Sequence, residues 1–223
     1  MTRSRRERRK NLRAVLCAFG FFLFFLTAQK ACCEVVKVAC VGDSVTYGKT
    51  IEDRTKDSYP AQLQRALGNG FDVENFGVNG ATLLRKGHRP YSSTDAFKAA
   101  KSFRADIVVI HLGLNDTDPR DWPDYRDDFR ADYSWLIAQF RESNPKAQIY
   151  VGILTPIFPP HPRFKSGTRD WAQEIRDEIP RIAKANHTGL IDFDTPLHAR
   201  PDLFSDAVHP DAEGCIDSCP FCL

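Results

Sequence analysis

The chain alternates short runs that are rich in Val, Ile and Phe with longer stretches in which apolar residues recur every three or four positions. Runs of the first kind, bounded by Gly, Asn, Asp or Pro, are typical of buried β-strands. They occupy residues 35–41, 71–76, 107–112, 148–154 and 189–193. We therefore predict five strands.

Helical spacing is found between these runs. Residues 129–140 and 171–182 each carry an apolar stripe, and residues 59–67 predict a shorter helix. Pro180 lies inside the second stripe, where we expect it to kink or break the helix. Strands separated by helices imply a parallel sheet that is covered on both faces. The predicted fold class is therefore α/β, with three layers (α/β/α) around a five-stranded parallel sheet.

The first thirty residues have the composition of a targeting segment. Residues 1–13 hold seven Arg or Lys against the single acid Glu7, and an apolar stretch runs from Ala14 to about Ala28. This order is that of a secretory signal, and the stretch is short for a membrane span. A basic nucleic-acid arm is disfavoured because it would not continue into five large apolar residues at 21–25. We expect a signal peptide or an uncleaved N-terminal anchor at residues 1–30, and a secreted, periplasmic or membrane-anchored protein.

Without residues 1–30, the net charge changes sign. The whole chain of 223 residues has 31 Lys or Arg and 29 Asp or Glu, whereas residues 31–223 have 23 and 28, a net charge of −5. A mildly acidic protein gives no reason to expect nucleic acid or an anionic membrane surface as a partner. The remaining length allows one domain with a sizeable core, which we place at residues 34–214.

Polar motifs lie where the predicted strands end. Gly42-Asp43-Ser44 follows the first strand, residues 75–80 close the second, residues 113–116 follow the third, and residues 206–209 follow the last. Ligands of parallel α/β sheets bind beyond the carboxyl ends of the strands, so these segments should meet there. They contain a serine, a histidine with a carboxylate three residues earlier, and candidate hydrogen-bond donors. These are the parts that nucleophilic ester hydrolysis needs.

Two other loop motifs do not fit. Gly48-Lys49-Thr50 ends like a phosphate-binding loop, but that pattern requires a glycine five residues before Gly48, where this chain has Asp43. The nucleophile elbow of α/β-hydrolases requires a glycine two residues after the serine, where this chain has Thr46. Nucleotide binding and an ordinary α/β-hydrolase are both disfavoured.

In order and spacing, the four segments resemble the SGNH, or GDSL, hydrolase family. The resemblance implies the flavodoxin-like SGNH hydrolase fold and a serine esterase that needs neither a cofactor nor a metal. Ser44 would be the nucleophile, His209 its base, and Asp206 the carboxylate that orients the imidazole. The backbone N–H groups of Ser44 and Gly80 and the side-chain amide of Asn115 would form the oxyanion hole. Taken singly, Ser44 could be a helix cap, Gly80 a turn glycine and Asn115 a strand-end cap.

Residues 41–48, 59–64 and 115–117 are similar to segments of bacterial carbohydrate O-acetylesterases, including the sialate type. We expect an exported esterase that removes small acyl groups, mainly acetyl, from a small-molecule or glycan ester. Arg89, Tyr91 and Trp122 are candidate substrate contacts, since cationic and aromatic side chains suit an anionic or stacked sugar.

Two alternatives to this function are kept. The first is a lysophospholipase or thioesterase of the same fold, which would need a long apolar groove beside Ser44. The second is an inactive carbohydrate-binding relative.

Residues 215–223 form a short tail with Cys215, Cys219 and Cys222. Three close cysteines without a suitable fourth ligand argue against zinc. The tail contains Pro220 and is too short to supply the amphipathic terminal helix that is usual in the family. Our hypothesis is that apolar surface beside the first strand is left uncovered, which would lower stability and activity.

Overall fold

The structure is a computed structural model, and it describes residues 34–159 and 168–217. The expected targeting segment, Cys219 and Cys222 lie outside these ranges, so the expectations about them stay predictions. Within the described ranges, no helix is long and apolar enough to cross a membrane.

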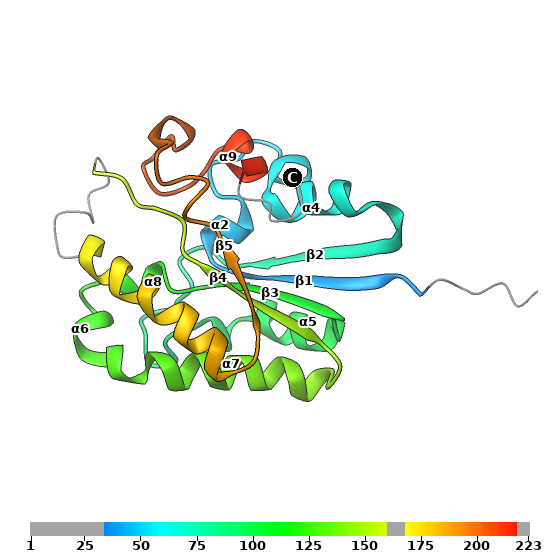
Figure 1. Ribbon diagram of the computed structural model, residues 1–223, viewed down its shortest axis with the longest axis horizontal. Helices are drawn as coiled ribbons and strands as arrows, with labels where there is room; N and C mark the ends of the chain where they lie inside the picture. The colour runs from blue at the N-terminus through cyan, green and yellow to red at the C-terminus, as the bar shows by residue number, and fades with distance from the viewer. Residues whose placement is uncertain (1–33, 160–167, 218–223) are drawn as a thin grey trace, which may run out of the picture. The chain divides into compact units, whose positions relative to one another are not determined.

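The five predicted strands form one parallel sheet in the order β2-β1-β3-β4-β5 (Figure 1). The strands are β1 Val36–Gly42, β2 Phe71–Gly77, β3 Ile107–His111, β4 Gln148–Ile153 and β5 Gly189–Asp192. Each observed end lies within one residue of the predicted one. Gly42 pairs with Gly77 on one side and with His111 on the other, so the carboxyl ends of the three strands on that side of the sheet are level. The predicted three-layer α/β fold is confirmed.

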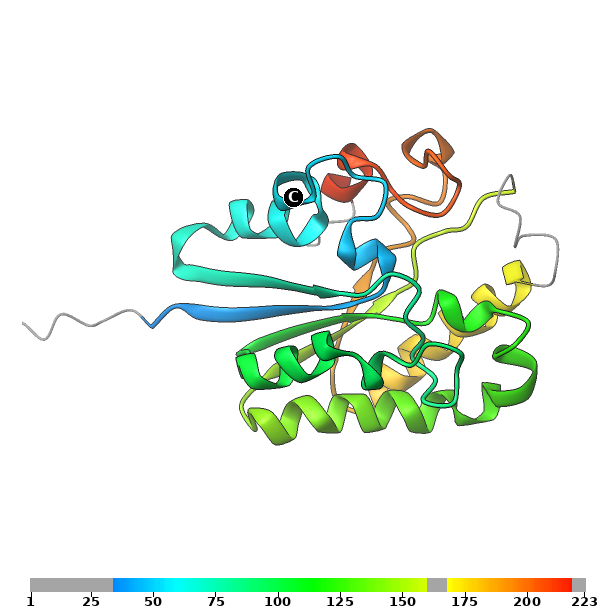
Figure 2. The same ribbon diagram turned by 180° about the vertical axis from the view of Figure 1, so that it is seen from behind.

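Helices cover both faces of the sheet (Figures 1 and 2). One face carries α4 Tyr59–Leu67 and α9 Ala212–Asp217, and the other carries α5 Asp95–Phe103, α7 Phe129–Ser143 and α8 Thr168–Ala185. Successive residues of β1 point to opposite faces because side chains alternate along a strand. Cys40 joins a buried cluster with Tyr59 and Leu63 of α4, whereas Val41 joins the main core with residues of α5, α7 and α8.

The longer helices follow the predicted stripes, with one correction. Helix α4 has the predicted bounds, and α7 and α8 contain the two longer stripes. We expected Pro180 to kink or break the last of these, and it does not break it, because α8 continues through Pro180 to Ala185. Ile175, Ile179 and Ile182, on both sides of the proline, are all buried in the main core. Packing of this face therefore keeps the two halves of the helix together despite the hydrogen bond that proline cannot donate.

Several short elements carry no periodic signal in the sequence. These are α2 Ser44–Tyr47, α3 Arg54–Asp57, α6 Trp122–Tyr125 and the 3₁₀ turns Gly68–Gly70, Tyr91–Ser93, Asn115–Thr117, Arg126–Asp128 and Pro201–Leu203. Helix α5 was also not predicted, because Phe97 and Ala100 are its only fully buried residues. Its start is marked by Thr94, whose hydroxyl accepts a hydrogen bond from the Phe97 N–H at 3.1 Å.

Helix α9 lies where we expected the structure to end in a tail. It has six residues, and within it Cys215 is buried in the cluster of Cys40, Tyr59 and Leu63. The side chain of Gln62 donates a hydrogen bond from Nε2 to the Ala212 carbonyl at 2.8 Å. The contacts of this short helix with the β1 and α4 side of the sheet therefore include a buried thiol and this hydrogen bond.

Two strand-end glycines allow α2 to lie against the sheet. A Cβ on Gly42 would lie 2.0 Å from the Thr46 hydroxyl oxygen, and a Cβ on Gly77 would lie 2.2 Å from the backbone nitrogen of Tyr47. Both distances are far below contact distance, and the second involves backbone that cannot rotate away. The sequence at the ends of β1 and β2 therefore determines how closely α2 approaches the sheet.

We expect Gly77→Ala to lower the free energy of unfolding by about 1–3 kcal/mol, because the added methyl group forces α2 away from β2. Thermal unfolding followed by circular dichroism measures this change. Gly70→Ala is the matched control, since a Cβ there meets no atom within 4 Å. Equal melting temperatures for the two variants would contradict the proposed close approach.

Candidate active site

The first strand delivers Ser44 to the carboxyl edge of the sheet. After β1 ends at Gly42, Asp43 caps α2: its Oδ1 accepts a hydrogen bond from the Val45 N–H at 2.9 Å. Ser44 is the first residue of α2, so its N–H is one of the amide groups that find no acceptor inside the helix. This N–H has no acceptor in the described part of the chain. The serine is only 5% exposed.

The loop after β5 places His209 against this serine. Nε2 of His209 lies 2.8 Å from the Ser44 Oγ, and its Nδ1 lies 2.6 Å from Oδ2 of Asp206. The other oxygen of Asp206 accepts hydrogen bonds from the N–H groups of Val208 at 3.1 Å and His209 at 2.8 Å. One carboxylate therefore orients both the backbone and the ring of His209. With its proton on Nδ1 directed at Asp206, the imidazole can accept the serine proton at Nε2.

A strained turn makes this arrangement possible. Ala207 has a φ of 66°, which is uncommon for a residue with a Cβ, and its carbonyl accepts a hydrogen bond from the Phe158 N–H at 2.9 Å. Burial acts to raise the pKa of Asp206, but the hydrogen bonds from His209 and Val208 outweigh it and hold this pKa below its ordinary value. The carboxylate is therefore ionised at neutral pH, as a partner of a charged imidazole must be.

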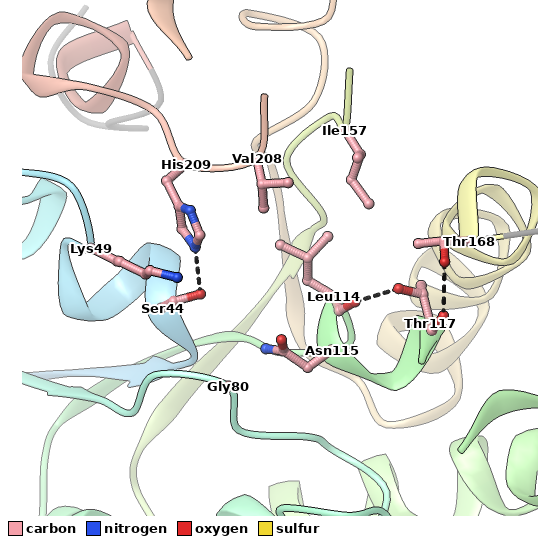
Figure 3. Close-up of a pocket in the computed structure, with 10 residues that line it drawn as sticks. All are labelled: Ser44, Lys49, Gly80, Leu114, Asn115, Thr117, Ile157, Thr168, Val208 and His209. Atoms are coloured by element: carbon pink, nitrogen blue, oxygen red, sulfur yellow. Dashed lines mark hydrogen bonds between the residues drawn. The ribbon is translucent and has the colours of Figure 1, made fainter. Parts of the chain in front are cut away.

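Gly80 and Asn115 come to the same place from the ends of β2 and β3. Gly80 has a φ of 75°, and its N–H has no acceptor among the residues that the structure describes. The Asn115 amide donates to the Ala81 carbonyl at 3.1 Å, and its nitrogen points toward the space between Ser44 and Gly80 (Figure 3). The structure thus brings together the serine, the histidine, the aspartate and the three predicted oxyanion donors.

A small pocket of about 110 Å³ opens beside Ser44. Its apolar wall consists of Leu114, Ile157 and Val208, with Thr117 and Thr168 next to it (Figure 3). Its volume is below the roughly 300–1,000 Å³ of pockets for drug-sized ligands. There is room beside the serine for a short substituent.

The profile of the GDSL-like lipase/acylhydrolase family matches residues 40–215, which include every residue of this constellation. The chain belongs to this family. The predicted assignment to the SGNH, or GDSL, family is confirmed.

Individual relatives of this GDSL hydrolase support the same assignment. An acetylxylan esterase of Xylanibacter ruminicola is 36% identical over 197 residues, which are 81% of this chain and 41% of that protein. The chain thus spans about two fifths of the length of this relative. A carbohydrate acetylesterase of Sinorhizobium meliloti has a TM-score of 0.65 at 22% identity, covering 82% of this chain and 94% of that one. The aryl esterase of M. smegmatis has a TM-score of 0.62 at 20% identity, with coverages of 84% and 94%. The two solved structures show that the fold is shared.

Two of the three predicted substrate contacts are contradicted by the structure of the hydrolase. Tyr91 is 1% exposed, and its hydroxyl donates to the Phe76 carbonyl at 2.8 Å. Trp122 is 3% exposed, and its indole N–H donates to Glu174 at 2.8 Å. Both aromatic side chains are core residues whose polar atoms already have partners inside the protein. They are therefore not available to stack on a sugar.

The third predicted contact, Arg89, lies at the site, and so does a cation that the sequence analysis missed. The exposed Arg89 places its Nη1 3.5 Å from the position that a Cβ on Gly80 would occupy. Lys49 lines the pocket together with Ser44 and His209 (Figure 3). Only its position five residues after Ser44, just beyond the short helix α2, could have indicated this from the sequence.

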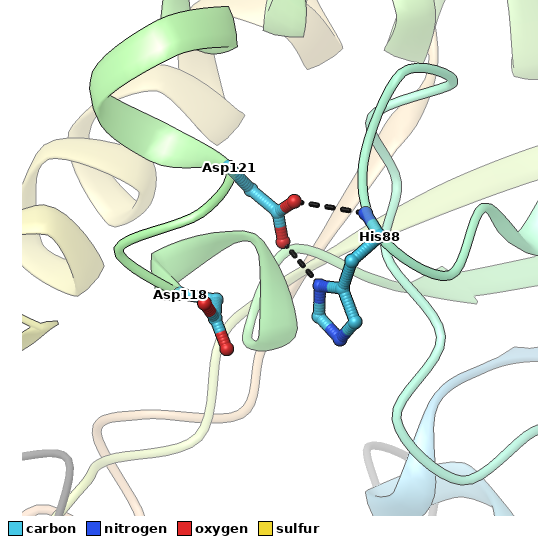
Figure 4. Close-up of side chains that lie close together, drawn as sticks. All are labelled: His88, Asp118 and Asp121. Atoms are coloured by element: carbon cyan, nitrogen blue, oxygen red, sulfur yellow. Dashed lines mark hydrogen bonds and ion pairs between the residues drawn. The ribbon is translucent and has the colours of Figure 1, made fainter.

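His88, Asp118 and Asp121 form a group of metal-binding residue types within the described ranges, with ligand atoms within 4.8 Å of one another (Figure 4). Asp121 accepts hydrogen bonds from the His88 N–H at 2.8 Å and pairs with its Nδ1 at 2.6 Å. Both oxygens of Asp118 accept from Arg120, at 2.8 and 2.9 Å. These internal pairs account for the group without an ion, and they fix the loop next to Arg89.

Two buried carboxyl groups brace the loops around Ser44. Asp116 accepts hydrogen bonds from the N–H groups of Leu83 at 2.9 Å and Leu84 at 2.7 Å. Asp43 uses one oxygen to cap α2, and its Oδ2 has no partner in the described part of the chain. Burial raises the pKa of each group to about 7. Each therefore binds its proton more tightly in the folded protein than in the unfolded chain.

We expect Asp43→Asn to make stability less dependent on pH between about 4 and 7. Because the pKa of Asp43 rises on folding from 3.8 to about 7, the folded state binds the extra proton in this window. The free energy of unfolding contributed by this group therefore falls as pH rises, by at most about 1.4 kcal/mol per pH unit, and levels off above pH 7.

Urea unfolding across this pH range measures the slope for the wild type and for Asp43→Asn. Asp95→Asn is the control, because Asp95 is exposed and its pKa is lowered by Lys98. An Asp43→Asn protein with the same slope as the wild type would contradict the role assigned to burial.

Proposed function

We propose that this chain is a serine esterase that removes small acyl groups, chiefly acetyl, from a carbohydrate. The observation that carries the proposal is the continuous hydrogen-bonded chain from Ser44 through His209 to Asp206, with contacts of 2.8 and 2.6 Å. A serine hydroxyl requires such a series of hydrogen bonds to act as a nucleophile at neutral pH.

The reaction follows from the positions of these groups. His209 takes the proton of Ser44 while Oγ attacks the ester carbonyl, and the oxygen of the tetrahedral intermediate accepts from the N–H groups of Ser44 and Gly80 and the amide of Asn115. His209 then gives the proton to the departing alcohol, which leaves an acyl-serine. A water molecule, activated by the same histidine, hydrolyses the acyl group and restores Ser44.

The size of the pocket supports a short acyl group. Leu114, Ile157 and Val208 enclose the apolar side of a space of only about 110 Å³, which suits a methyl group better than a long chain. The alternative lysophospholipase or thioesterase would need a long apolar groove. Among the described residues, the hollow next to Ser44 is instead this small pocket with threonines beside it.

The choice of a carbohydrate as the substrate rests on the relatives. The acetylxylan esterase that is 36% identical to this chain, and the carbohydrate acetylesterase that shares its fold, both carry acetylated carbohydrates in their names. The exposed cations at the rim, Lys49 and Arg89, also suit a polar alcohol portion rather than a lipid. The basic and apolar order of residues 1–30 supports export as a further part of the proposal.

We expect a fluorophosphonate probe to label the wild-type protein and not Ser44→Ala, because Ser44 is the hydroxyl that His209 activates. Labelling is read by intact-protein mass spectrometry. Ser102→Ala, which removes an exposed serine of α5, is the control and should be labelled like the wild type. If Ser44→Ala were still labelled, another nucleophile would carry the reaction.

We expect kcat/KM to fall by about 10-fold or more from acetyl to octanoyl in a series of p-nitrophenyl esters, because the pocket has no room for the longer chain. Release of acetate from acetylated xylan oligosaccharides tests the carbohydrate part of the proposal. Faster turnover of octanoyl than of acetyl esters would instead support the lipid-ester alternative.

A further inference from the structure

Lys49 lies on the opposite side of the reacting groups from the apolar wall. Figure 3 shows Ser44 and His209 in the middle, with Lys49 on one side and Leu114, Ile157 and Val208 on the other. The buried apolar side suits the acyl group of an ester. The exposed side that holds Lys49 is therefore where the alcohol portion, the sugar, would lie.

The Lys49 ammonium has no carboxylate partner within the described ranges, although it lines the pocket. Four other lysines of the domain do have such partners, at 2.8 to 3.4 Å: Lys56, Lys86, Lys98 and Lys101. A cation beside the nucleophile that is not neutralised by the protein is a ready site for an anionic group of a ligand.

The backbone holds Lys49 in place through a strained turn. Its N–H donates to the Ser44 carbonyl at 3.0 Å, directly linking it to the nucleophile. Gly48 before it and Thr50 after it have φ values of 85° and 75°. The second value is unusual for a β-branched residue, and the Thr50 hydroxyl donates to the Lys49 carbonyl at 2.5 Å. Strain of this kind is found where a functional side chain must be positioned.

Arg89 supplies a second cation from another loop. It lies against Gly80, and it has no carboxylate partner among the residues that the structure describes. Its backbone is fixed from both sides, because its carbonyl accepts from the Thr82 N–H at 2.9 Å and the preceding His88 is bound twice by Asp121. The site thus has two positioned cations, Lys49 just beyond the end of α2 and Arg89 beside Gly80.

We propose that Lys49, with Arg89 as a second cation, binds a carboxylate of the sugar, so that the hydrolase prefers acetylated acidic sugars of the uronic acid class over neutral ones. The inference rests on the proposed function and adds the charge of the substrate to it. The ammonium of Lys49 is a compact point charge, which suits a carboxylate that reaches it from a sugar ring.

The test uses D-glucuronate and its uncharged methyl ester as competitive inhibitors of p-nitrophenyl acetate hydrolysis. The wild type should bind glucuronate about 10-fold more tightly than the methyl ester, the effect of one partly exposed charge-assisted hydrogen bond. Lys49→Met should bring this ratio close to one, and Arg89→Met should lower it partly. The wild-type ratio should also fall as salt is raised, since exposed charges are screened.

Lys146→Met is the matched control and should keep both the ratio and the turnover of the wild type. Lys146 is an exposed lysine just before β4, at the amino end of the sheet and far from Ser44. A wild type that binds both inhibitors equally, or a Lys49→Met protein that keeps the wild-type ratio, would overturn the inference.

Release of acetate from two glycans, measured beside the inhibitor binding of the wild type, separates this inference from the proposed function. The wild type could hydrolyse both acetylated xylan and acetylated glucuronoxylan and yet bind the two inhibitors equally. This result would leave the esterase proposal intact and overturn the role of Lys49. Discrimination between the inhibitors without release of acetate from either glycan would support the carboxylate site and contradict the proposed carbohydrate substrate.

Discussion

The contact between His209 and Ser44 joins two residues that are 165 positions apart, and the proposed chemistry of the site depends on it. Each end of the contact is fixed by backbone rather than by side-chain packing alone. On the serine side, the absence of side chains at Gly42 and Gly77 lets α2 lie directly on the ends of β1 and β2. On the histidine side, Asp206 binds both the ring and the main chain of His209. A change at either end would move a proton-transfer distance that tolerates little error.

Strained backbone and a buried carboxyl group are found close to this contact. Four residues other than glycine have positive φ in the described part of the chain: Thr50, Arg104, His187 and Ala207. Arg104 and His187 lie just beyond the ends of α5 and α8, where a left-handed residue is an ordinary way to end a helix. Thr50 and Ala207 instead stand next to Lys49 and the Asp206–His209 pair. The buried Asp43, with one oxygen lacking a partner in the described residues, adds to this pattern. The stable sheet behind these loops is what allows them to keep strained conformations.

The sequence predicts the sheet well because the central strands β1 and β3 are mostly buried and read as nearly continuous apolar runs. The residues of the candidate site could be found because they follow strand ends at a characteristic spacing. Which side chains are exposed at the site could not be predicted in the same way. Tyr91 and Trp122 have polar atoms that suit a surface, yet Phe76 and Glu174 satisfy those atoms inside the protein. In the sequence, Lys49 is notable only within a motif that resembles a phosphate-binding loop, and the tertiary structure is needed to show that it lines the pocket with Ser44. Pro180 does not end α8, since the packing of this helix against the core outweighs the local preference of one residue.

The difference between the residues that hold the reacting groups and the exposed residues at the rim explains how one set of reacting groups can serve several substrates. Asp43 and Asp116, which brace the loops around Ser44 and Asn115, are buried and accept hydrogen bonds from backbone N–H groups. Asp206, which is only partly buried, does the same for His209. Substitutions at these positions would therefore disturb the loops as well as the chemistry. Lys49 and Arg89 have exposed side chains, so a change at either position leaves the buried core intact. Their backbone is nevertheless held firmly, by the Ser44 carbonyl for one and by the Thr82 and Asp121 contacts for the other. Such positions can change the charge of the rim at little expense in stability while still presenting the new side chain at a defined place. Substrate preference in this fold can therefore diverge at the rim while the proton-transfer geometry beneath it stays the same.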